Sequence, residues 1–146
     1  RGDDMSNLSN FVYDLQSMAS AQPEVNAFGE GNIYDLLNSG GQIEKYAAVI
    51  ITLQSVNIVD DNYSINCTIF YVDRLTKNPL NSENNRLEIQ DTAVDTLHNI
   101  LLQLGEEYEI ENENYTLFTQ KFADNCAGAY ITLKITLPIS GCFEQY

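Results

Sequence analysis

The last third of the chain has the clearest alternation of apolar and polar positions. From Ala129 to Ile139 the odd-numbered residues are Ala, Ile, Leu, Ile, Leu and Ile, and the even-numbered ones are Tyr, Thr, Lys, Thr and Pro. A period of two over such a length is typical of an antiparallel strand that buries one face. The pattern therefore predicts a long strand that needs a covering layer or a neighbouring subunit.

A β-hairpin is predicted near the middle of the chain. Tyr46 to Val59 is rich in Ile, Val and Thr, and Tyr63 to Val72 alternates between apolar and polar residues. The polar segment Asp60-Asp61-Asn62 between them is typical of a turn. A further short strand is expected from Tyr115 to Thr119.

Two segments carry apolar residues three and four positions apart, as one-sided helices do. The first begins with Ser6 as its cap and runs to about Ala21, where Gln22-Pro23 ends it. The second runs from about Asn85 to Gln103, with Gly105 as its predicted stop. The segment 23–45 lies between the first helix and the hairpin. It contains four glycines and one short helical turn at Ile33 to Asn38.

These elements predict an α+β fold of the order α-β-β-α-β-β. We expect a two-layer sandwich, in which a largely antiparallel four-stranded sheet carries both long helices on one face. The shared core is expected to contain Leu15, Leu97, Leu101, Ile131, Leu133 and Ile135. We expect residues 1–146 to form a single domain. Residues 1–4 are interpreted as a non-native remnant or a disordered end, because Met5 would be a natural start.

Charge and cysteine content narrow the function classes. Seven basic and 21 acidic residues give a net charge of −14, which argues against specific binding to nucleic acid or to an anionic membrane. The longest apolar run is far shorter than the roughly 18 residues of a membrane helix. Cys67, Cys126 and Cys142 are odd in number, which favours free thiols in a reducing compartment.

The residues that could carry chemistry form no convincing constellation. His98 is the only histidine, and it lies off the apolar stripe of the second helix. Five glutamates between Glu106 and Glu113 could attract a cation, but a solvated sheet edge is the commoner role of such a run. We therefore predict no catalytic, cofactor-binding or metal-binding residues, and we do not expect an enzyme.

The ordered landmarks of the chain resemble a known class of proteins. These landmarks are Gln22-Pro23-Glu24-Val25-Asn26, Gly29-Glu30-Gly31-Asn32-Ile33-Tyr34-Asp35, Tyr71-Val72-Asp73-Arg74 and Phe122-Ala123-Asp124-Asn125. The sequence resembles small virion proteins of tailed bacteriophages, notably crAss-like and other phages of Bacteroides-type hosts. Its helix–hairpin–helix–hairpin order is similar to that of tail-terminator and tail-completion proteins. The resemblance spans nearly the whole chain, but its landmarks are structural and carry no chemistry.

The resemblance implies a non-enzymatic structural subunit of the virion neck or tail, made in the cytoplasm of the bacterial host. As a tail completion, tail terminator or head–tail connector protein, it would contact copies of itself in a six- or twelve-fold ring, and adjacent connector and tail proteins. The segment 23–45 is apolar enough to pack either on its own domain or on a neighbouring subunit. Its candidate interface residues are Val25, Phe28, Ile33, Tyr34, Leu36 and Leu37.

Two other functions fit the composition. A small acidic protein-binding module or assembly chaperone has the same size and charge, and a stable monomer would favour it over a ring. A small hydrolase or isomerase ranks last, because it needs an acid or base with a perturbed pKa and the chain offers one histidine.

Overall fold

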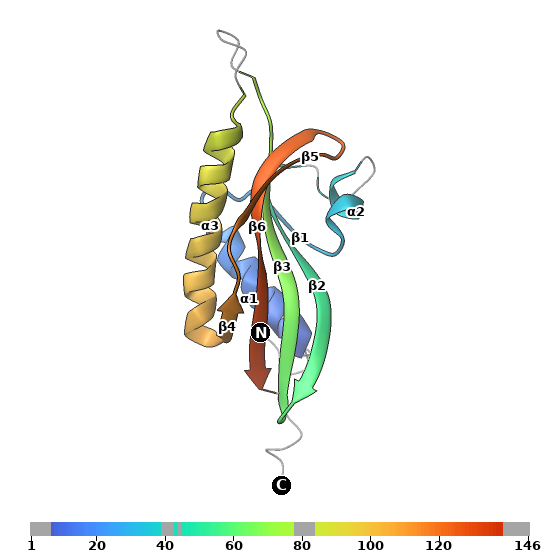
Figure 1. Cartoon of the computed structure of the whole chain (residues 1–146), viewed down its shortest axis with the longest axis vertical. Helices are drawn as coiled ribbons and strands as arrows, with labels where there is room; N and C mark the ends of the chain where they lie inside the picture. The colour runs from blue at the N-terminus through green and yellow to red at the C-terminus, as the bar shows by residue number, and fades with distance from the viewer. Residues whose placement is uncertain (1–6, 39–42, 44, 78–83, 139–146) are drawn as a thin grey trace.

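The computed structural model describes residues 7–38, 43, 45–77 and 84–138. It is an α+β protein with helices packed on a mixed, mostly antiparallel open sheet (Figure 1). The helices are α1 (Asn7–Ser20), α2 (Ile33–Leu37) and α3 (Arg86–Glu107). The strands are β1 (Ala27–Glu30), β2 (Ala48–Val59), β3 (Asn62–Arg74), β4 (Glu109–Asn112), β5 (Thr116–Lys121) and β6 (Asn125–Pro138).

The sheet is ordered β1-β2-β3-β6-β4, and β5 also pairs with β6. Only the β1–β2 pair is parallel. β6 pairs with β3 along one of its edges. Along its other edge it pairs first with β5 and then with β4. Residues 113–115 lie between β4 and β5 and face only residues 131–132 of β6, so the edge carries one extra residue. An extra residue of this kind is a β-bulge, and β4 and β5 together act as one bulged edge strand.

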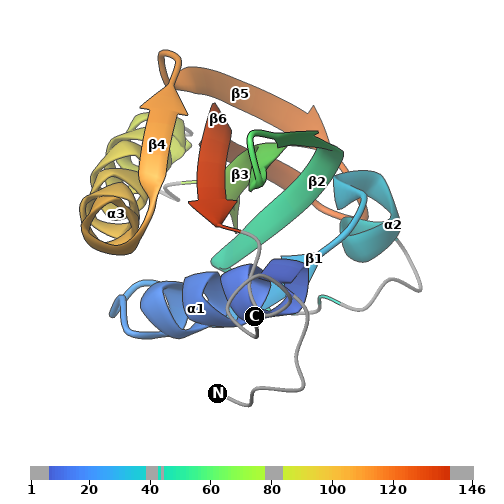
Figure 2. The same cartoon turned by 90° about the horizontal axis from the view of Figure 1, so that it is seen from below.

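The sheet separates two hydrophobic cores. On one face, α1 and α3 cover the large core, which contains all of the predicted core residues except Leu101 as fully buried members. On the other face, α2 covers a smaller core (Figure 2). Val49 and Ile51 of β2 face the first core, whereas Ala48 and Ile50 face the second. Because both faces are covered there, the start of β2 is a continuous apolar run.

The predicted hairpin is confirmed, although β2 begins two residues later than the predicted Tyr46 and β3 extends beyond the predicted Tyr63 to Val72 at both ends. Its turn has two residues, since Val59 pairs with Asn62. Asp60 and Asp61 have φ values of 49° and 64°, and positive φ at both central residues is what a type I′ hairpin turn requires.

Several predicted boundaries are wrong. The sheet has six strands rather than four, because the short strands β1 and β4 lack an alternation long enough to detect. β6 begins at Asn125, four residues before the apolar alternation becomes regular. The short helical turn at Ile33 is confirmed as α2, but it lies on the face opposite the long helices.

The second long helix runs through Gly105 to Glu107, so Gly105 is not its stop. The helix ends where Tyr108 turns toward α1: its hydroxyl donates to Asp14 at 2.6 Å, and its ring packs edge-on against Phe11 with centroids 5.5 Å apart. Tertiary contacts with α1 therefore fix this end, and a C-terminal glycine does not. Leu101 lies at the rim of the large core and is partly buried.

Candidate functional site

The predicted interface residues lie mostly within their own domain. Ile33, Leu36 and Leu37 are buried against the back of the sheet, with Leu37 only 1% exposed. Val25 and Phe28 are partly buried against the large core. These contacts order the described part of segment 23–45 without a second chain. Of the six residues, only Tyr34 leaves about half of its side chain free, at 48% exposed.

The β2–β3 hairpin offers a more exposed surface. β1 pairs only with Ala48–Ile51, so the outer edge of β2 from residue 53 onward has no strand partner among the residues that the structure describes. Every residue from 54 to 61 is exposed. The group includes Ile58 at 67% and Val59 at 55% exposed. Figure 1 shows the hairpin reaching past β1 and α2 to one end of the molecule. Its tip therefore combines two exposed apolar side chains with the two aspartates of the turn.

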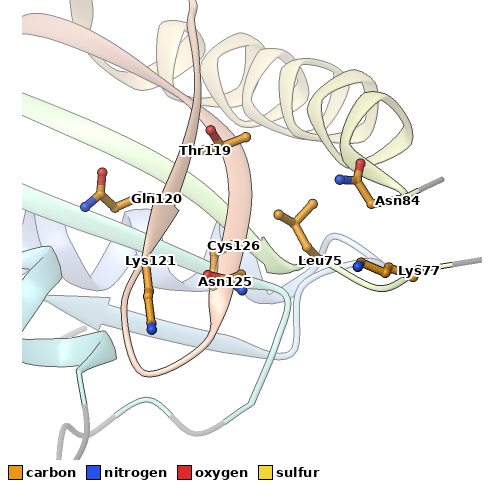
Figure 3. A pocket seen from close by; sticks show the side chains of 8 residues that line it. All are labelled: Leu75, Lys77, Asn84, Thr119, Gln120, Lys121, Asn125 and Cys126. Carbon is orange, nitrogen blue, oxygen red and sulfur yellow. The ribbon is translucent and has the colours of Figure 1, made fainter. Parts of the chain in front are cut away.

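A hollow of about 430 Å³ lies at the opposite end of the sheet. It is lined by Leu75, Lys77, Asn84, Thr119, Gln120, Lys121, Asn125 and Cys126 (Figure 3). Two lysines and no carboxylate stand among the described residues that line it. This is notable in a chain whose acidic residues outnumber its basic residues three to one.

Backbone pairing holds the two lysines on either side of the hollow. Lys121 is the last residue of β5 and pairs with Asn125. The Leu75 N–H donates to the Asn125 carbonyl at 2.8 Å, which fixes Leu75 beside the start of β6. Lys77 forms an isolated antiparallel bridge with Asn84, supported by the neighbouring bond from Thr76 N–H to the Asn85 side chain at 2.7 Å. Both cations thus project from ordered backbone.

A second group of polar side chains lies beside the hollow. The Arg74 guanidinium is 5.9 Å from the centre of the Tyr46 ring, and the Cys126 thiol donates to the Asp124 carbonyl at 3.5 Å. Burial raises the pKa of Tyr46, with smaller contributions from Cys126 and Asp124. Burial also raises the pKa of Cys126 and of Asp73. A raised pKa keeps a thiol protonated and unreactive, so Cys126 is suited to a structural role and is a poor nucleophile.

The remaining candidates are structural or solvated. Cys67 is buried in the large core, and burial raises its pKa to about 12. Cys67 and Cys126 are both free thiols, as predicted, while Cys142 lies outside the described residues. His98 is exposed, and its Nδ1 lies 3.5 Å from the Tyr115 hydroxyl.

The described residues contain no group of three or more His, Cys, Asp or Glu side chains that could hold a metal ion. None of the helices in this part of the chain is long and apolar enough to cross a membrane.

A scan against protein-family models and a search of curated proteins each found no match for this chain. The lysine-lined hollow was not predicted from the sequence, because Lys77 and Lys121 are 44 positions apart and carry no shared motif. The hairpin was predicted, but the exposure of its outer edge was not. The edge is exposed because β1 is short, and a strand of four residues has no recognisable pattern in the sequence.

Proposed function

We propose that this chain is a non-enzymatic structural subunit that assembles with copies of itself into a ring at the neck or tail end of a tailed-phage virion. The observation that carries the proposal is the exposed outer edge of the β2–β3 hairpin. Strand edges are templates for pairing with other chains, and proteins that stay monomeric usually guard them with charge, a bulge or a cover. β2 has one bulge, between Leu53 and Ser55, but it carries no charged residue from Ala48 to Val59, so its edge beyond the bulge is suited to contact another protein.

The opposite side of the sheet is guarded in all three of these ways. Glu109 and Glu111 lie on β4, and a bulge separates β4 from β5. The buried Gln90 of α3 donates to the backbone oxygen of Phe118 at 3.1 Å and so covers part of β5. β2 also has a bulge but lacks the charges, and this contrast supports a contact role for β2 in particular.

The resemblance to phage virion proteins is what supports placing this ring at the neck or tail end of the virion. A tail completion, tail terminator or head–tail connector protein works through contacts with its own copies and with adjacent connector and tail proteins. Burial raises the pKa of the Cys126 thiol, so the cysteine that lines the hollow stays protonated, which fits a non-enzymatic role.

The test is the mass of the purified chain, measured by light scattering after size-exclusion chromatography, alone and with its connector and tail partners. We expect a closed oligomer that electron microscopy shows as a ring. Ile58→Lys should reduce the assembly to monomers by placing a charge on the edge. Leu87→Lys is the matched control, because Leu87 is equally exposed, at 68%, but lies on α3. A wild-type chain that stays monomeric with and without these partners would contradict the ring and favour the protein-binding module.

A further inference from the structure

The hairpin tip and the lysine-lined hollow have complementary chemistry. The tip presents Asp60 and Asp61 beside exposed Ile58 and Val59. The hollow presents Lys77 and Lys121 around the partly buried Leu75. We propose that the tip of one copy docks in the hollow of a second copy, with the aspartates against the lysines. This inference rests on the proposed self-assembly and names the two surfaces that meet in it.

The two surfaces cannot meet within one copy. β6 runs between them: its first residue, Asn125, pairs with Lys121 beside the hollow, and its last, Pro138, pairs with Asn62 beside the turn. At about 3.3 Å per residue, this strand separates tip and hollow by roughly 43 Å. A contact between different surfaces of two copies is heterologous, and repeating it generates a ring when the rotation closes.

The lysines of the hollow are available for such a contact. Between described residues the one ion pair within 4 Å joins Lys134 to Glu111 at 3.9 Å, on the strands β6 and β4. Lys77 and Lys121 are both exposed, and neither is paired with a described carboxylate. The tip and the hollow of one copy are separated by several times the Debye length, which is about 8 Å at physiological salt. The aspartates of the tip therefore do not neutralise the lysines of the same copy.

The two parts of the contact contribute in different ways. Opposite charges orient the encounter and reject wrong registers more than they add affinity. Burial of Ile58 and Val59 against Leu75 supplies the apolar component, which is insensitive to screening. Assembly should therefore weaken with added salt but should not vanish.

The tip can be neutralised without harming the hairpin. In Asp60→Asn/Asp61→Gly the turn becomes Asn-Gly, the pair that type I′ turns prefer. This variant should unfold at an equal or higher temperature than the wild type, yet its apparent dissociation constant for self-association should rise at least about tenfold. Lys77→Glu/Lys121→Glu should have the same effect through the hollow. Lys134→Glu is the matched control, because it reverses the charge of a lysine that lies in neither the tip nor the hollow.

Mixing the variants tests the pairing itself. The tip variant keeps an intact hollow, and the hollow variant keeps an intact tip. At a concentration between the dissociation constants of the wild type and the variants, each variant alone should be monomeric by light scattering, while an equimolar mixture should form a 1:1 complex that grows no further. A hollow variant that forms rings like the wild type would overturn the inference and leave the proposed ring standing. A hollow variant that loses only its binding to connector or tail proteins would also overturn it, by giving the hollow a different occupant. A wild-type chain that never self-associates would overturn both proposals.

Discussion

Gly128 is the position at which one added methyl group should do most damage. It lies in the middle of the sheet on β6, where it pairs with Val72 of β3 and Phe118 of β5. A Cβ added to Gly128 would lie 2.9 Å from the Tyr71 carbonyl carbon and closer still to its oxygen, with Phe118 Cε1 at 3.2 Å. Ordinary van der Waals contacts of a Cβ begin at about 3.4 Å, so Gly128→Ala cannot fit without moving the β3 backbone.

The cost follows from what has to move. β3 is held between β2 and β6, so a retreat from Gly128 disturbs hydrogen bonds on both of its sides. Overpacking typically costs about 1–3 kcal/mol, and the obstacle here is backbone rather than a flexible side chain. Each weakened ladder hydrogen bond adds about 0.5–1.5 kcal/mol. We expect Gly128→Ala to lower the free energy of unfolding by about 3–5 kcal/mol, a large part of the roughly 5–15 kcal/mol that a domain has.

Urea denaturation followed by circular dichroism measures this cost against two matched glycines. At Gly105 an added Cβ meets nothing within 4 Å, so Gly105→Ala should stabilise the exposed side of α3 by about 0.5–1 kcal/mol. At Gly29 the Cβ meets the flexible ends of Ile43 and Leu36, at 2.8 and 3.1 Å, and should cost less than at Gly128. A loss below about 1 kcal/mol for Gly128→Ala, or a different order of the three variants, would refute the reasoning.

Two further stability predictions follow from burial in the large core. Leu97 is 1% exposed whereas Leu101 lies at the core rim, so Leu97→Ala should cost about 2–5 kcal/mol in denaturation and Leu101→Ala clearly less. Burial raises the pKa of the Cys67 thiol from 9.0 to about 12, so the unfolded chain ionises it first. Its contribution to stability is complete below about pH 8 and declines as pH rises from about 9 to 12. The unfolding free energy of wild type minus that of Cys67→Ala should therefore fall over that range, and a constant difference would contradict the buried thiol.

Long periodic segments made much of the fold predictable. The alternation in β3 and β6 and the one-sided stripes of α1 and α3 each repeat often enough to identify the element and its buried face. β1 and β4 have four residues each, which is too short for a period to be recognised. β4 also consists of alternating glutamates, a pattern that serves equally well for a loop. Its place in the sheet is set by pairing with β6, which is a long-range contact.

The candidate surfaces were less predictable than the fold, for a physical reason. Apolar residues such as Leu36 and Leu37 can be buried in their own domain or against a partner, and the sequence pattern is the same in both cases. Conversely, Lys77 and Lys121 look like ordinary solvated residues until the sheet brings them to one end. The outer edge of β2 stays exposed because β1 is much shorter than the hairpin. How much of β2 is covered by β1 is known only from the register of the two strands.

The distribution of charge favours a heterologous contact over a two-fold one. The hairpin turn lies at the same end of the sheet as the start of β4, since Ser64 and Glu109 both pair with Thr136. Asp60, Asp61, Glu109 and the last turn of α3 therefore make this end strongly acidic. A tip-to-tip dimer would bring two such ends together, and like charges at close range are unfavourable. A tip-to-hollow contact places the acidic end of one copy against the lysines of the next. Because a heterologous contact is also the kind that can close into a ring, the placement of the lysines and the proposed assembly agree.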